Sequence, residues 1–191
     1  MTNDKIDLIE HFKPYILKCR PGDWEHAKRV VSWIKNLASK RDDLYLLMIA
    51  GYIHDIGWSN LVKDESKLTR EDLLKLQPQA DKHTDALVKL ALADLCLSDD
   101  DLNKVLRLIR STETYNATQD DEMIMVDADN LSKTSPEHVK EKYVKSDWLN
   151  ICKLFEEKFP QRIKTELGKQ LFPKKLEKLR KTLEKELSLG Q

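Results

Sequence analysis

The segment LYLLMIAGYIHDI, residues 44–56, decides the fold class, because ten of its thirteen residues are hydrophobic. It is too short for a membrane span, which needs roughly 18 or more apolar residues. A helix that is apolar on every side is typical of the buried centre of a helical bundle. We therefore expect a central helix over about residues 42–56, with Gly57 as its C-terminal cap.

The sequence on either side of this segment shows the 3.6-residue periodicity of amphipathic helices. Upstream, apolar residues recur every three or four positions and predict a helix over residues 23–39. Downstream, the same pattern predicts helices at about 80–95, 99–114, 121–133 and 136–159, and in a final Lys/Glu-rich segment. These expectations make the chain all-α and a single domain over residues 1–191.

The net charge and the cysteine content indicate which kinds of partner to expect. The 33 basic residues balance the 33 acidic ones, so no overall positive potential attracts nucleic acid or an anionic membrane. Cys19, Cys96 and Cys152 are odd in number and widely spaced, which argues against a disulfide framework and a thiolate zinc site. The first residues lack the apolar stretch of a signal peptide. We expect a cytoplasmic protein with a small-molecule partner, and no nucleic-acid or membrane partner.

Two ionisable residues, His54 and Asp55, end the apolar central helix. A buried carboxylate without compensation costs several kcal/mol, so positive charge is expected nearby, and a divalent cation would supply it. The simpler alternative is an imidazole held by a neighbouring carboxylate or a backbone carbonyl. His26, at the edge of the upstream stripe, and Asp129, inside a later apolar run, bring the ligand-type residues to four on three core helices.

Three short motifs in this order resemble those of the HD-domain superfamily of metal-dependent phosphohydrolases. They are EHAKRV at residues 25–30, IHDIG at 53–57 and VDADNL at 126–131. The resemblance covers about residues 20–135 and leaves residues 136–191 as a helical extension. It implies an HD-type helical bundle that binds one divalent metal ion and acts on a small phosphorylated substrate.

The resemblance also implies which residues bind the metal: His26, His54, Asp55 and Asp129, with Asp55 in addition orienting the attacking water. Asp127 is the alternative for the last ligand, but residues two apart on a helix point about 200° from each other. Asp127 is then a cap, a partner of a ligand or a substrate contact. Two imidazoles and two carboxylates favour Mn²⁺, Mg²⁺, Fe²⁺ or Co²⁺ over a structural zinc ion.

The sequence departs from the HD pattern at two places. Trp58 stands where related proteins often carry a lysine, so we expect Arg29, one turn from His26, to bind the substrate phosphate instead. The alternative for Arg29 is an interhelical ion pair. Of the histidines that a second metal would need, only His83 is available, so a dinuclear site is disfavoured. His83 is expected just before a helix. It could bind a phosphate or act as a general acid, and the alternative is an ordinary histidine at a helix start.

The leading hypothesis is single-metal hydrolysis of a phosphate ester or anhydride in a small metabolite, with a nucleotide as the first choice. The alternative, motivated by Trp58, is a metal-stabilised binding or regulatory module with weak catalysis. Nucleic-acid binding by the Lys-rich tail after Phe172 is disfavoured, because Lys and Glu alternate there. His11 and His138 lie on faces dominated by Lys and Glu, and we expect them to be solvated.

Overall fold

The computed structural model describes residues 6–62 and 69–189, and within these ranges the chain is all-helical, with no strand. The α-helices are α1 (Leu8–Ile16), α2 (Asp23–Leu37), α3 (Leu44–Ile53), α4 (Arg70–Leu92), α5 (Asp99–Thr114), α6 (Asp120–Lys133), α7 (Pro136–Lys142), α8 (Trp148–Arg162) and α9 (Glu166–Ser188). Short 3₁₀ helices are η1 (Ile56–Trp58), η2 (Ala93–Leu95) and η3 (Lys145–Asp147). No helix in the described ranges is both long and apolar enough to cross a membrane.

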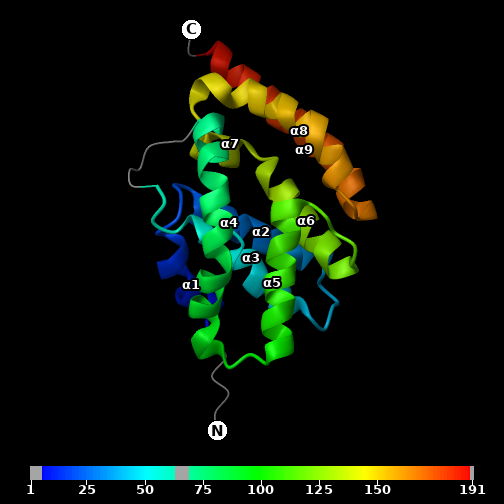
Figure 1. The fold of residues 1–191 in the computed structure, drawn as a ribbon. Helices are drawn as coiled ribbons and strands as arrows, with labels where there is room; N and C mark the ends of the chain where they lie inside the picture. Colours follow the sequence, from blue (N-terminus) through cyan, green and yellow to red (C-terminus); the bar gives the residue numbers. More distant parts are fainter. Residues whose placement is uncertain (1–5, 63–68, 190–191) are drawn as a thin grey trace.

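Helix α3 lies at the centre of the bundle, where α1, α2, α5 and α6 pack around it (Figure 1). Its residues Leu47, Ile49 and Ile53 are fully buried. Gly51 favours close packing of α2 on α3, because a Cβ at this position would lie 2.5 Å from Ile34 Cδ1 and would make that side chain shift. The segment that is apolar on every side therefore forms the buried central helix that was expected.

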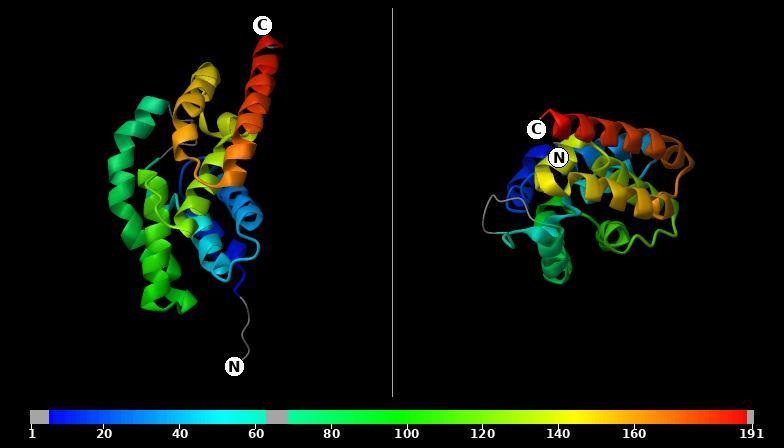
Figure 2. Two further views of the ribbon diagram at one scale, coloured as in Figure 1. Left: turned by 90° about the vertical axis from the view of Figure 1, so that its right-hand side faces the viewer. Right: turned by 90° about the horizontal axis from the view of Figure 1, so that it is seen from above.

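The remaining helices form two further groups. Helices α4 and α5 run side by side as a hairpin across one face of the bundle (Figure 1), and α8 and α9 pack on each other and on α6 (Figure 2). One apolar cluster extends from α1 to α6, and a second from the end of α6 to α9. Trp33 and Leu37 of α2 contact both clusters, so α2 and α6 join the C-terminal helices to the bundle.

The boundaries of two helices differ from expectation. Helix α3 ends at Ile53, and Gly57 is not its cap but lies in η1. A Cβ at Gly57 would be 2.4 Å from the Ala80 carbonyl oxygen, so a glycine is required because α4 crosses closely at this point. Helix α4 itself begins about ten residues earlier than expected, because Thr69 and Asp72 form a reciprocal capping box at its start.

The helix expected over 136–159 is split into α7 and α8. Between them the backbone of Tyr143 and Val144 is extended, and η3 follows. The indole nitrogen of Trp148 donates to the Tyr143 carbonyl oxygen at 3.3 Å and stabilises the turn. The apolar stripe continues across the break because α8 faces the second apolar cluster, so periodicity alone does not reveal the change of direction.

Candidate metal centre

Four acceptor atoms from three helices converge at one place in the core. His26 lies on α2, His54 and Asp55 lie at the end of α3, and Asp129 lies on α6. His26 Nε2 is 3.1 Å from His54 Nε2 and 3.2 Å from Asp129 Oδ1. Asp55 Oδ2 is 3.5 Å from His54 Nε2 and 3.8 Å from His26 Nε2. The structure thus brings the four expected ligands together with their acceptor atoms inward.

The other ring nitrogen of each histidine is held by a hydrogen bond, which fixes the orientation of both rings. His54 Nδ1 donates to the Gly51 carbonyl oxygen at 3.0 Å. His26 Nδ1 lies 3.0 Å from Ser132 Oγ, and this hydroxyl donates its one hydrogen to the Asp129 carbonyl oxygen at 2.8 Å. His26 Nδ1 is therefore the donor to Ser132, and the lone pair of His26 Nε2 is available to a metal ion.

The four inward-facing acceptor atoms do not have enough hydrogen-bond donors among them to satisfy one another. Asp129 Oδ1 accepts no hydrogen bond within the described residues. Burial lowers the pKa of His26 to about 4, so its ring is neutral at pH 7. Burial also opposes a charge on His54, but Asp55 and Asp129 outweigh it and raise the pKa of His54. The site therefore attracts positive charge, and its donor set fits a divalent ion.

Two cations keep the carboxylates ionised. Burial on its own would raise the pKa of Asp55, but Arg20, with Nη2 2.6 Å from Oδ2, and the two histidines hold this pKa well below its ordinary value. Burial likewise opposes ionisation of Asp129, and Lys133, with Nζ 2.5 Å from Oδ2, is the main group that lowers its pKa. Both carboxylates are therefore available as metal ligands, with a positive group beside each.

Arg20 and Lys133 were not singled out from the sequence. Lys133 lies four residues after Asp129 on one helix, and this spacing could have indicated the ion pair. Arg20 had no such signal, because its guanidinium reaches Asp55 from the turn before α2 and stacks over Trp58 at 4.1 Å from the ring centroid. Trp58, expected to mark the loss of a cation, instead supports one.

A cavity of about 390 Å³ opens onto the four ligands. Its wall also carries five basic side chains: Arg20, Lys133, Lys142, Lys158 and Arg162. The last three belong to α7 and α8, so helices after residue 135 form part of the wall. A cavity of this size suits a small molecule, and pockets for such ligands are usually a few hundred Å³.

Two residues that were expected at the substrate do not line this cavity. Arg29 donates two hydrogen bonds to Glu141 of α7, at 2.6 Å and 3.3 Å, which is the interhelical ion pair considered as its alternative. His83 lies within α4 rather than before a helix, and its neighbour Thr84 faces the cavity instead. The geometry gives neither Arg29 nor His83 contact with a ligand bound there.

Asp127 supports the N-cap of α9 rather than capping a helix itself, so a cap is the nearest of the three roles expected for it. Its Oδ1 accepts from Lys164 N at 2.7 Å, and its Oδ2 accepts from Thr165 N at 2.8 Å and Thr165 Oγ1 at 2.6 Å. Thr165 is in turn the N-cap of α9. The carboxylate thus fixes the turn between α8 and α9, and Asp127 does not line the cavity.

His138 was expected to be solvated, but it is buried in the cavity wall. Its ring lies 4.7 Å from the His26 ring, centroid to centroid. Its Nδ1 has no hydrogen-bond partner in the part of the chain that the structure describes. The charged neighbours of His138 on α7 concealed this position, because α7 covers the site with one buried face. An unpartnered buried nitrogen in a cavity wall can bind a ligand at little cost in desolvation.

The simpler interpretation, an imidazole held by a carboxylate or carbonyl, accounts for only one nitrogen of His54. The Gly51 carbonyl satisfies Nδ1, whereas Nε2 faces His26, Asp55 and Asp129. Comparisons with protein-family models, curated proteins and solved structures find no match to this chain. The geometry of the site and the residues that line the cavity are therefore the features that indicate a function.

Proposed function

We propose that this chain is a metal-dependent phosphohydrolase that hydrolyses a phosphate ester or anhydride of a small metabolite, with nucleotides as the first class to test. The observation that supports this proposal is the convergence of four buried acceptor atoms at a cavity whose wall carries five basic side chains. A site with only a structural role would not require a cavity beside the ligands. The sequence resemblance to HD-domain phosphohydrolases points to the same four residues.

The proposed ligands are His26 Nε2, His54 Nε2, Asp55 Oδ2 and Asp129 Oδ1. Two imidazoles and two carboxylates suit Mn²⁺, Mg²⁺, Fe²⁺ or Co²⁺, and the three cysteines of the chain take no part. A bound divalent ion would lower the pKa of a water molecule and polarise a phosphoryl oxygen. The unpartnered Asp129 Oδ1 is the feature of the protein that best fits such an ion.

The protein side chains then have separate tasks. Arg20 and Lys133 each have donors beside a ligand carboxylate, so they are placed to bind the other phosphoryl oxygens through charge-assisted hydrogen bonds. Asp55 is ionised and partly exposed to the cavity, so its carboxylate can orient the attacking water and accept its proton. His138 offers a further hydrogen-bonding atom to the substrate. We assign no part in the reaction to Arg29, His83 or Asp127.

A binding or regulatory module is the second candidate, and one contact favours it. Asp55 Oδ2 is closer to Arg20, at 2.6 Å, than to either histidine. A carboxylate that is held this tightly by a guanidinium is a weaker base for water. In such a module the same cavity would bind a phosphorylated ligand without hydrolysing it.

Elemental analysis of the purified protein, combined with a phosphatase screen, tests the proposal. The screen would use nucleoside mono-, di- and triphosphates and sugar phosphates, with release of inorganic phosphate as the readout. We expect about one equivalent of a divalent metal and turnover of at least one class, both lost in His54→Gln and Asp55→Asn. His11→Gln is the matched control, because His11 bonds the Ala91 carbonyl and does not line the cavity. Metal without turnover of any phosphate would favour the binding module, and a metal content unchanged by His54→Gln would reject both.

A further inference from the structure

Within the described part of the chain, two of the cations in the cavity wall have no carboxylate partner. Of the five basic residues there, three are held by acids: Arg20 by Asp55, Lys133 by Asp129 and Lys142 by Asp23. Lys158 and Arg162 form no hydrogen bond and no ion pair with any residue in the ranges 6–62 and 69–189. They lie four residues apart, so they share one face of α8 and both line the cavity.

Arg162 is held in position by an aromatic ring rather than by an acid. Its Cζ lies 3.5 Å from the centroid of the Tyr115 ring. A guanidinium that stacks through its flat face keeps its N–H groups, which point outward from its edge, free for a carboxylate or phosphate. The stack restricts the side chain before any ligand binds, which reduces the entropy cost of binding. Arg162 is thus preorganised, and it forms no ion pair with the residues that the structure describes.

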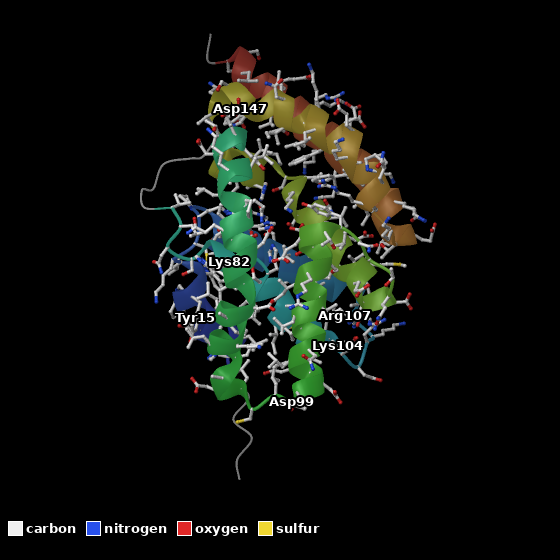
Figure 3. All side chains as sticks on the ribbon, in the orientation of Figure 1. Tyr15, Lys82, Asp99, Lys104, Arg107 and Asp147 are labelled. Atoms are coloured by element: carbon white, nitrogen blue, oxygen red, sulfur yellow. The ribbon has the colours of Figure 1, made fainter. Side chains whose placement is uncertain are left out.

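Another basic pair shows that this situation is not general in the chain. Lys104 and Arg107 lie three residues apart on one face of α5 (Figure 3). Arg107 binds Asp121 and Glu122, and Lys104 binds Asp43 and Asp121. That pair neutralises buried acids and has a structural role. Lys158 and Arg162 have no such acids to neutralise.

A short series of contacts connects Arg162 to the metal centre. Lys133 Nζ lies 2.5 Å from Asp129 Oδ2 and 5.8 Å from the centroid of Tyr115. Arg162 stacks on the same ring at 3.5 Å. Tyr115 itself adopts a left-handed backbone conformation, with φ 56°, at the end of α5. One small molecule can therefore reach both the metal ligands and Arg162 within a single cavity.

We propose that Lys158 and Arg162 form an anion subsite that binds a second anionic group of the substrate. Given the proposed phosphohydrolase activity, on which this inference rests, the substrate class is a small organic molecule with two separate phosphate groups. One phosphate lies at the metal centre beside Arg20 and Lys133, and the other at Arg162 and Lys158. The subsite comes from α8, which lies outside residues 20–135, the part of the chain that resembles HD-domain proteins.

Alkyl phosphonates test the subsite, because their C–P bond is not a substrate for ester hydrolysis and binding is read without turnover. Isothermal titration of the metal-containing protein would compare propylphosphonate, which has one anionic group, with the propane-1,3- and hexane-1,6-bisphosphonates. We expect the better bisphosphonate to bind about tenfold to a hundredfold more tightly than propylphosphonate, the range for one charge-assisted interaction. In Arg162→Gln this ratio should fall close to one, while the affinity for propylphosphonate stays unchanged.

Further variants separate the subsite from general effects of charge or folding. Arg162→Lys should recover only part of the ratio, because an ammonium group cannot form the bidentate contact. Lys158→Gln should lower the ratio by a smaller factor, since Lys158 is exposed at the rim. Lys153→Gln removes the same charge from an exposed position of α8 outside the cavity wall, and it should leave the ratio unchanged.

Three results would overturn the subsite. They are equal affinity of the mono- and bisphosphonates, no binding of either, and an equal loss of both ligands in Arg162→Gln. Failure of the phosphohydrolase proposal is seen separately, as a metal content that does not respond to His54→Gln. Tight binding of a bisphosphonate that depends on Arg162 but not on His54 would support the subsite and count against catalysis at the metal centre.

Discussion

Asp127 and Asp129 lie two residues apart on α6, both fully buried, and the structure gives them different tasks. Asp129 Oδ1 faces the two histidines, whereas Asp127 accepts three hydrogen bonds from the turn before α9. We predict that Asp129→Ala removes the metal and that Asp127→Ala removes stability without removing the metal. The two variants delete the same atoms from the same helix, so each is the matched control for the other.

The magnitudes follow from the contacts. Loss of the partner of a metal ligand typically lowers metal affinity 10- to 100-fold, so loss of the ligand Asp129 itself should exceed about 100-fold. Asp127→Ala leaves three donors without an acceptor, and about 0.5–1.5 kcal/mol for each hydrogen bond gives roughly 2–4 kcal/mol. For a chain of this length 1 kcal/mol corresponds to about 2–4 °C in Tm, so the expected loss is roughly 5–15 °C.

Two measurements check this prediction. Elemental analysis after dialysis reports retained metal, and thermal unfolding with and without added Mn²⁺ reports whether a metal ion still stabilises the folded state. We expect Asp129→Ala to lose both the metal and the Mn²⁺-dependent rise in Tm, and Asp127→Ala to keep both at a lower Tm. If Asp127→Ala loses the metal while Asp129→Ala keeps it, the assignment of the last ligand is wrong.

Three further substitutions have outcomes that the structure predicts. Arg29→Ala should lower Tm by a few degrees, because it removes an ion pair with Glu141 that contributes about 1 kcal/mol. It should leave the affinity for propylphosphonate unchanged, and a weaker affinity would show that Arg29 binds the ligand. Gly57→Ala should cost about 1–3 kcal/mol in chemical denaturation, because its Cβ would meet the Ala80 carbonyl of α4, and an unchanged midpoint would contradict that packing. His138→Phe should raise Tm by removing an unpartnered buried nitrogen and should weaken propylphosphonate binding at constant metal content; unaltered binding would make the residue structural.

The parts of the fold that could be predicted from the sequence are those that depend on local pattern. The buried helix α3 follows from a segment that is apolar on every side, and α2, α5 and α6 follow from apolar spacing. The residues of the candidate metal centre could be singled out for a related reason. His54 and Asp55 are polar groups at the end of a hydrocarbon helix, and the cost of burying them makes them conspicuous even before any contact is known.

The parts that could not be predicted depend on contacts between distant segments. Asp127 was ambiguous because its donors, Lys164 and Thr165, are 37 and 38 residues away in the sequence. The burial of His138 is not evident from the sequence, because a helix with charged residues on most of its surface can still bury one face. The break between α7 and α8 was missed because the apolar residues keep their spacing across it.

Helix α6 sets the position of α8 and α9 relative to the candidate metal centre. Asp129 faces the histidines on one side of this helix, and Asp127, about 200° away around the axis, fixes the turn that joins α8 to α9. Arg162 is the last residue of α8 and lies three residues before Thr165, so this hydrogen-bonded turn also restrains the proposed anion subsite. Helix α6 and the turn between α8 and α9 therefore fix the distance between the two proposed anion positions. Asp127→Ala should accordingly weaken the binding of bisphosphonates more than that of propylphosphonate, although Asp127 contacts neither ligand. Equal weakening of both would show that the turn does not position Arg162.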